Sequence, residues 1–184
     1  MKKIISLFCR NYETDRLIRD EVVAGAEWVI AGEGVATRKL DGTCCMVRDG
    51  DLFKRYEVKR GRTPPPDFEP ACEVDPNTGK RQGWRPIEPT DPSDKYHWLA
   101  FSGNEPDGTY ELIGPKVQGN PEKAEGHVLV PHGSEEVAAP RTFLELREWL
   151  REAGIEGVVW HHPDGRMVKV KAKDFGWRRG EALK

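Results

Sequence analysis

Residues 166–173 constrain the fold of this chain most strongly, because apolar and cationic side chains alternate along them. The apolar positions are Val168, Val170 and Ala172, and the cationic positions are Lys169, Lys171 and Lys173. Side chains two positions apart on a strand share a face, so this alternation predicts a strand with one buried face and one cationic face. The fold therefore contains a sheet with its core on one side. Lysines in such a row usually form a solvated face, and this alternative stays open until the rest of the chain is considered.

Several other short runs also favour strands over helices. Their composition and turn residues predict strands at residues 27–30, 35–39, 43–47, 52–58, 96–101, 109–113 and 155–160. The Asp49-Gly50 turn predicts a hairpin that returns Lys59, Arg60 and Arg62 towards Lys39. A second hairpin joins residues 155–160 to residues 166–173. Glu156 shares the lysine face of this hairpin if the turn holds an even number of residues, whereas an odd turn requires a bulge.

Residues 140–154 carry the clearest helix signal. Thr142 and Glu145 form a capping-box pattern, and Gly154 is placed to end the helix. Its apolar stripe consists of Phe143, Leu146, Trp149 and Leu150, which predicts packing against one face of a sheet. Many strands and few helices together indicate an α+β fold of antiparallel sheets flanked by helices.

Prolines dominate residues 61–95 and predict a long ordered loop, since proline lacks a backbone donor. Within this loop, Arg81, Trp84 and Arg85 combine cations with an aromatic ring, a combination that suits a phosphate backbone and an unstacked base. The alternative is that Trp84 only anchors the loop to the core.

Composition limits the class of protein. A chain of 184 residues with 37% hydrophobic content suits one domain, and a net charge of −2 gives no global basic field for nucleic acid. Any polyanion must therefore bind a local patch. No apolar run is long enough for a membrane span or a signal peptide, so we expect a soluble cytoplasmic protein without a membrane partner. The four cysteines show no C-x-x-C spacing and are expected to be reduced.

Lys39 is the candidate nucleophile. It ends a predicted strand and is followed by Asp41 and Gly42, and glycine allows a ligand to approach the backbone closely. A lysine amine attacks phosphorus when its neighbours lower its pKa from the free value of about 10.4. The pattern Lys-x-Asp-Gly alone is weak, and a solvated strand end is the plain alternative.

Five motifs in order favour the nucleophile over the solvated strand end. They are Lys39-Leu40-Asp41-Gly42, a basic segment at Lys59-Arg60, Glu111 on a strand, Glu156-Gly157-Val158 and Lys169-Val170-Lys171. Over residues 33–173 the chain resembles the covalent nucleotidyltransferases, namely ligases and capping enzymes. The sequence Lys-Leu-Asp-Gly-Thr-Cys-Cys is most similar to the RNA ligase 1 family, which includes the vertebrate 5′–3′ RNA ligase.

The resemblance implies a single nucleotidyltransferase (adenylation) domain over residues 1–184, with an ATP-grasp-like ligase core and no OB domain. It implies that Lys39 attacks ATP and carries AMP, and that Lys169 and Lys171 lower its pKa and hold phosphate oxygens. By the same resemblance, Glu156 binds Mg²⁺ or Mn²⁺, Glu111 accepts a hydrogen bond from the ribose, and Arg60 contacts the sugar-phosphate. Asp41 is expected to be structural.

The resemblance also implies RNA ends with a 5′-phosphate and a 3′-hydroxyl as the partners, and no obligate protein partner. Candidate RNA contacts are Arg62, Arg81, Trp84 and Arg85, together with Lys59, Lys80, Arg178 and Arg179. The resemblance leaves the adenine platform unassigned, because only His127 and His132 occupy the expected segment.

Two other nucleotidyltransferases remain open, a DNA nick ligase and a GTP-using capping-type enzyme. Both usually carry an OB domain after the Lys-x-Lys strand, and this sequence ends at Lys184. An inactive RNA-binding or nucleotide-binding relative is the alternative from another class, although no charged motif position is missing. A zinc site at His161-His162 is disfavoured, since adjacent residues of a strand diverge.

Overall fold

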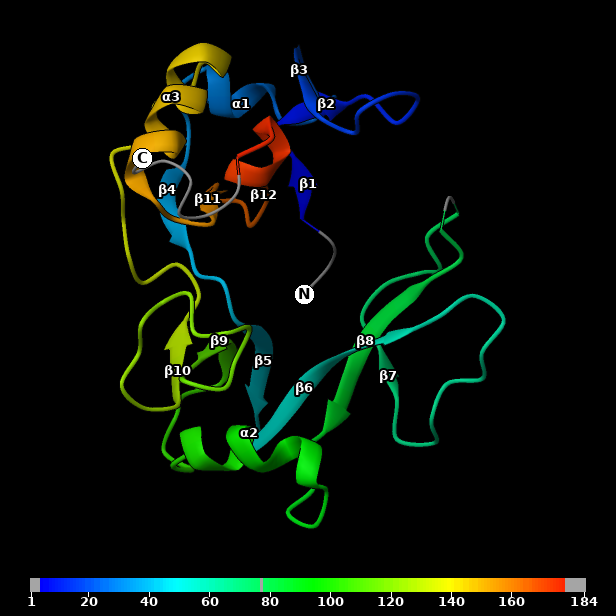
Figure 1. The fold of residues 1–184 in the computed structure, drawn as a ribbon. Helices are drawn as coiled ribbons and strands as arrows, with labels where there is room; N and C mark the ends of the chain where they lie inside the picture. The colour runs from blue at the N-terminus through cyan, green and yellow to red at the C-terminus, as the bar shows by residue number, and fades with distance from the viewer. Residues whose placement is uncertain (1–3, 77, 178–184) are drawn as a thin grey trace. The chain divides into compact units, whose positions relative to one another are not determined.

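The computed structural model describes residues 4–76 and 78–177, and it confirms the α+β class: most elements are strands, with few helices (Figure 1). The chain divides into two compact units. Of the described residues, the first unit comprises 41–76 and 78–132, and the second comprises 4–40 and 133–177. The single nucleotidyltransferase domain stays a prediction.

The second unit is built on a four-stranded sheet in the order β1-β12-β11-β4. Its strands are β1 (Ile5–Ser6), β12 (Met167–Lys171), β11 (Gly157–His161) and β4 (Val35–Lys39). The sheet is antiparallel except at β1, which pairs with β12 in parallel, so the expectation of antiparallel sheets fails at this edge. A small hairpin of β2 (Phe8–Arg10) and β3 (Ile18–Val22) accompanies the sheet.

Two helices, α1 (Glu27–Ile30) and α3 (Phe143–Ala153), supply buried residues to one core with this sheet (Figure 1). That core contains Trp28 and Val29 of α1, Leu146 and Leu150 of α3, and the strand residues Val158, Trp160, Val168 and Val170. The buried valines of β12 alternate with Lys169 and Lys171, as the sequence predicts. The two lysines therefore lie on the sheet face opposite the core.

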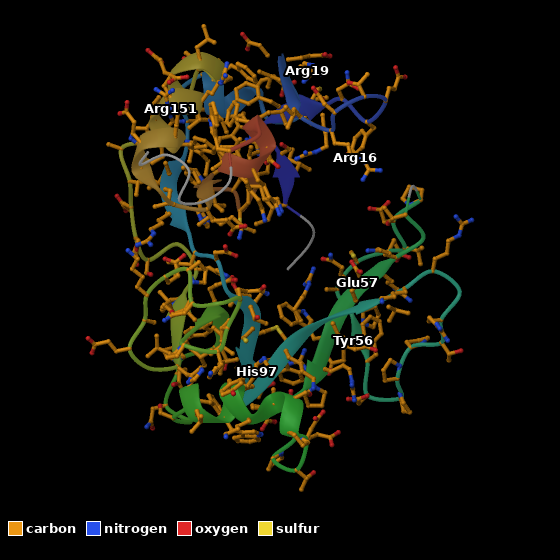
Figure 2. All side chains as sticks on the ribbon, viewed as in Figure 1. Arg16, Arg19, Tyr56, Glu57, His97 and Arg151 are labelled. Carbon is orange, nitrogen blue, oxygen red and sulfur yellow. The ribbon has the colours of Figure 1, made fainter. Side chains whose placement is uncertain are left out.

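The first unit is built on a six-stranded sheet in the order β10-β9-β5-β6-β8-β7. Its strands are β10 (Val128–Pro131), β9 (Gly108–Ile113), β5 (Thr43–Arg48), β6 (Asp51–Val58), β8 (Arg81–Pro86) and β7 (Glu69–Pro70). A 3-10 turn, η1 (Pro92–Asp94), leads into helix α2 (Lys95–Ala100), whose His97 is labelled in Figure 2. Figure 2 also labels Tyr56 and Glu57 on β6. The Asp94 carboxylate is fully buried, and the Lys54 ammonium donates to both of its oxygens at 2.7 and 2.8 Å.

Three predicted elements are wrong. Residues 27–30 and 96–101 were expected as strands but form helices α1 and α2. The side chain of Asp91 accepts a hydrogen bond from the Ser93 N–H at the start of η1, and this cap favours helical continuation over the strand preference of the following aromatic residues. The expected continuous loop at residues 61–95 contains strand β8, which pairs with β6 along its whole length from Arg81 to Pro86. Its only proline is the last residue of the strand, where it interrupts the ladder least.

Helix α3 confirms the expected helix, and Gly154 ends it in the left-handed conformation. All four cysteines are free thiols, as expected. Among the described residues, no helix is both long enough and apolar enough to cross a bilayer.

Candidate active site

The candidate nucleophile and the cationic strand meet across one glycine. Gly157 of β11 pairs with Lys39 of β4 on one side and with Lys171 of β12 on the other. Directly opposed residues of antiparallel strands point to the same face, so both lysines rise over the side-chain-free position 157. The next row pairs Val159 with Thr37 and with Lys169 in the same way. The structure thus brings together Lys39, Lys169 and Lys171, as predicted.

Glu156 holds two of these lysines. One carboxylate oxygen lies 2.5 Å from the Lys39 ammonium, and the other lies 2.5 Å from the Lys171 ammonium. The side chains are largely covered, with exposed fractions of 11% for Glu156 and 19% for each lysine. Burial alone would raise the pKa of Glu156, but the charges and hydrogen bonds of the two lysines outweigh it and lower that pKa. Glu156 is therefore an ionised bridge between the two ammonium groups.

Glu156 reaches the lysine face without the expected bulge. The turn between β11 and β12 spans residues 162–166, an odd number, and the pairing register is continuous. Glu156 precedes the first residue of β11, where its carbonyl still accepts the Ala172 N–H at 2.9 Å. Its side chain is free to turn towards the lysines because it lies at the strand end and not within the strand.

Lys169 differs from the other two lysines. Among the described residues its ammonium has no hydrogen-bond or ion-pair partner, although its side chain is only partly exposed. Burial, followed by the charges of Lys171 and Lys39, lowers the pKa of Lys169 to about 8. The lysine face thus carries three amines and one carboxylate, and this excess of positive charge favours an anionic ligand.

Gly157 is required by the close approach of β12. A Cβ atom at this position would lie 2.1 Å from the Val170 carbonyl oxygen and 2.9 Å from the Lys171 Cα. Both are backbone atoms, so no side chain fits without moving the strand that carries the lysines. The backbone N–H of Lys171 also donates to the Asp174 carboxylate at 3.0 Å, which fixes the end of β12.

The residues after Lys39 are anchored by two carboxylates of the first unit. The Asp41 N–H donates to Glu122 at 2.9 Å, and the Gly42 N–H donates to Glu111 at 3.0 Å. The second oxygen of Glu111 lies 2.8 Å from His132 Nε2, and Glu111 is buried with an exposed fraction of 6%. Both carboxylate oxygens thus have partners, as a buried charge requires. A Cβ at Gly42 would lie 2.2 Å from the Leu112 carbonyl oxygen, so this motif position also requires glycine.

The remaining predicted residues belong to the first unit and divide into exposed and engaged groups. Arg60 and Arg62 are exposed in the turn that follows β6. In contrast, Arg85 donates from Nε to both oxygens of Asp67, at 3.0 and 2.8 Å, and Arg81 donates to the Cys72 carbonyl at 3.1 Å.

Trp84 is only 4% exposed, and the Arg55 guanidinium lies 4.9 Å from its ring centroid. In this structure the ring does not offer a face for base stacking, so the predicted stacking platform is not supported. The placement agrees with the alternative, in which Trp84 anchors this segment. Arg178 and Arg179, named as further cations, lie outside the described residues.

The two adjacent histidines diverge, as expected. His161 Nε2 lies 3.0 Å from Thr37 Oγ1, whereas His162 Nε2 lies 2.9 Å from Glu33. In the described part of the chain, no group of three or more His, Cys, Asp or Glu side chains is arranged to hold a metal ion.

Sequence reasoning missed Glu122, the contact between His132 and Glu111, and Asp174. Only Asp174 had a usable signal, because an acidic residue three positions after a strand end forms a capping pattern around residues 171–174. The other contacts join segments far apart in the sequence, and no local pattern marks them.

Comparison with known proteins identifies the family. The family described as RNA ligase 1 matches residues 99–182, which include Glu111, Glu156, Lys169 and Lys171. Curated relatives named RNA ligase 1 are 38% identical in Danio rerio, 35% in Pongo abelii and 27% in Mus musculus. Each alignment covers 77% of this chain and 67% of the relative. The chain therefore belongs to the RNA ligase 1 family, as its motifs predicted.

Proposed function

We propose that this protein is an ATP-dependent RNA ligase that joins 5′-phosphate and 3′-hydroxyl RNA ends through a Lys39–AMP intermediate. The observation that carries the proposal is the cluster of Lys39, Lys169 and Lys171 around the single carboxylate of Glu156, on the sheet face opposite the core. The relatives named RNA ligase 1 support RNA as the substrate.

The charge of the cluster suits a phosphate. Three amines outnumber one carboxylate, and their side chains are mostly withdrawn from water. Fixed cations at such a site stabilise charge on a transferring phosphoryl group without reorganising during the reaction. A phosphate would also give the Lys169 ammonium an ion-pair partner in direct contact, which no described residue provides.

In the first step, the Lys39 amine attacks the α-phosphorus of ATP. A nitrogen–phosphorus bond forms, the bond to pyrophosphate breaks, and one proton leaves the amine. Lys39 must first leave its ion pair with Glu156, 2.5 Å away. Because the lysines lower the pKa of Glu156 below its ordinary range, this carboxylate is a weak base. We therefore assign Glu156 to holding and orienting Lys39 and not to removing its proton.

In the following steps, a 5′-phosphate oxygen of RNA attacks the phosphorus of lysine-bound AMP and releases Lys39. The 3′-hydroxyl then attacks the 5′-phosphorus of the adenylated end, forms the phosphodiester and expels AMP. Lys171 is placed to hold phosphate oxygens near Lys39, since both flank Gly157.

A divalent cation, Mg²⁺ or Mn²⁺, belongs to the proposal. Glu156 is the residue that would hold it, and one carboxylate with phosphate oxygens and water matches the usual Mg²⁺ donor set. When bound, the ion supplies positive charge at the phosphate oxygens.

The roles of the first unit rest on the family resemblance. We assign Glu111 to the ribose and Arg60 to the sugar-phosphate, and we propose the nucleotidyltransferase core on the same ground. For RNA, Arg62 is exposed, and Arg81 and Arg85 would have to exchange their present partners for phosphates.

The test is a ligation assay with matched RNA and DNA strands carrying 5′-phosphate and 3′-hydroxyl ends, with ATP or GTP and Mg²⁺. The proposal expects ATP-dependent sealing of RNA, weakened by salt, and poor sealing when the 3′-hydroxyl strand is DNA. Lys39→Arg is the matched variant, since arginine keeps the charge beside Glu156 but is not a nucleophile. Equal sealing of an all-DNA nick would favour the DNA nick ligase, and labelling by GTP alone would favour the capping-type enzyme. A protein that binds RNA without either reaction would be an inactive relative.

A further inference from the structure

The edge strand β1 contributes a hydroxyl group to the lysine face. Ser6 pairs with Lys169 in the parallel β1–β12 ladder, and the Leu7 N–H donates to the Lys169 carbonyl at 2.8 Å. Leu7 is fully buried in the core together with Val168 and Val170. Since neighbouring strand residues point to opposite faces, Ser6 lies on the same face as Lys169 and Lys171.

The Ser6 hydroxyl is buried and has no hydrogen-bond partner within residues 4–76 and 78–177. A buried hydroxyl without a partner costs free energy, and such groups are rare in native proteins. Lys169, its neighbour in the ladder, has no partner among the described residues either. Two unsatisfied donors, one neutral and one cationic, thus lie side by side. A phosphate group carries acceptor oxygens for both.

We propose that Ser6 and Lys169 form a subsite for the pyrophosphate part of ATP, with both side chains donating to oxygens of the leaving group. The inference rests on the proposed function and adds a residue outside the family resemblance, which spans residues 33–173.

Position on the sheet favours the leaving group over the α-phosphate. Lys171 lies two strands from Lys39, about 10 Å away at a spacing of about 4.8 Å. Ser6 lies three strands away and two residues further along, which puts it about 16 Å from Lys39 on the same spacings. Attack and departure at phosphorus are roughly in line, so the leaving group points away from the lysine. The Ser6–Lys169 subsite lies farther from Lys39 than Lys171 does, on the side to which the leaving group departs.

The subsite predicts that only one part of the reaction changes when Ser6 is replaced. Only the adenylation of Lys39 and its reversal by pyrophosphate involve the leaving group. Sealing of RNA that already carries a 5′-adenylate does not involve pyrophosphate. Removing the hydroxyl should therefore affect the first reaction and spare the second.

The experiment compares the full-length protein with Ser6→Ala, Ser6→Cys and Ser6→Thr. For Ser6→Ala and Ser6→Cys we expect the KM for ATP, and the pyrophosphate concentration that removes AMP from the adenylated protein, to rise about tenfold. Sealing of pre-adenylated RNA should stay within about twofold of the parent. Ser6→Thr keeps the hydroxyl and should restore most of the loss. Ser102→Ala, which alters an exposed serine, is the control.

The fold provides a separate readout. Because the Ser6 hydroxyl has no partner, Ser6→Ala should not lower the temperature of thermal unfolding. An unchanged KM for ATP in Ser6→Ala and Ser6→Cys would overturn the subsite. An equal loss in adenylation and in sealing of pre-adenylated RNA would also overturn it, since that indicates a structural role. In both cases the parent protein still ligates RNA, whereas failure of the parent would refute the proposed function itself.

Discussion

Replacing Glu156 by glutamine should destabilise the protein more than replacing either lysine that it holds. Each ammonium lies 2.5 Å from one carboxylate oxygen, and the three side chains are 11–19% exposed. Removing one partner of a buried ion pair costs about 3–5 kcal/mol, whereas exposed pairs contribute below about 1 kcal/mol. For this largely covered site we expect Glu156→Gln to lower the free energy of unfolding by about 2–4 kcal/mol.

The lysine variants should cost less because the carboxylate keeps one counter-charge. Lys39→Met and Lys171→Met each leave Glu156 paired with the other lysine, and we expect losses of about 1–2 kcal/mol. The triple variant Lys39→Met, Glu156→Met, Lys171→Met replaces all three charged side chains by apolar ones of similar volume. It should recover most of the loss, as exchanges of buried ion networks for apolar residues often do.

The pH dependence follows from the lowered pKa of Glu156. A carboxyl group with a lowered pKa stabilises the folded state at pH values above its unfolded pKa, near 4.5. That contribution is lost as the pH falls below 4.5 towards the lower pKa of the folded state. The difference between the parent and Glu156→Gln should therefore be largest near neutral pH and shrink in acid.

Urea denaturation at pH 7 and at about pH 4 measures both effects, with Lys173→Met as the exposed control. A loss of stability in Glu156→Gln no greater than that in the single lysine variants would contradict the bridging role of Glu156. A loss in Glu156→Gln that does not depend on pH would contradict it as well.

Three further predictions concern single positions. Gly157→Ala forces a Cβ to 2.1 Å from the Val170 carbonyl oxygen, so it should lower the free energy of unfolding by about 1–3 kcal/mol and abolish adenylation. Unfolding and labelling assays measure both effects, and the control Gly126→Ala, whose Cβ meets no atom within 4 Å, should show neither. Lys169→Met should raise the free energy of unfolding at pH 7 by at most about 3 kcal/mol while impairing adenylation. The pKa of Lys169 falls from 10.5 to about 8 on folding, so the parent protein gains stability as the pH rises from about 8 to 10.5. The higher stability of Lys169→Met should therefore vanish above pH 10.5, which thermal unfolding at several pH values measures. Asp94→Ala removes the fully buried carboxylate that pairs with Lys54, and it should lower the free energy of unfolding in urea by about 3–5 kcal/mol. A loss below about 1 kcal/mol would contradict a stabilising ion pair between Asp94 and Lys54.

Local patterns predicted the elements that carry the candidate site. The alternation along β12, the turn residues before β6 and the capping pattern of α3 are all short-range signals, and each of these elements formed. Two details differ: the strand expected over residues 166–173 ends at Lys171, where a 3-10 turn (Ala172–Phe175) begins, and the Thr142 hydroxyl donates to Glu145 at 2.6 Å instead of capping the helix backbone. The wrong predictions fell on α1 and α2, which span only four and six residues. Apolar runs this short do not distinguish a strand from a helix, and the cap at Asp91 decided the second case.

The motif order predicted that Lys39, Lys169, Lys171 and Glu156 act together, and the structure brings these four into one cluster. It did not predict that Glu156 would bridge two lysines, because that depends on Gly157 pairing with both neighbouring strands. The Ser6 hydroxyl was missed for a related reason. A two-residue parallel edge strand has no periodicity to recognise, and its partner lies more than 160 residues away.

Mapping of the modified residue decides whether Lys39 carries AMP. The protein is incubated with ATP and Mg²⁺ without RNA, its intact mass is measured, and the modified peptide is sequenced by tandem mass spectrometry. We expect one AMP per chain, attached to Lys39 and removed by pyrophosphate, and no adduct in Lys39→Arg. AMP on another residue, or an adduct of equal yield in Lys39→Arg, would contradict this expectation.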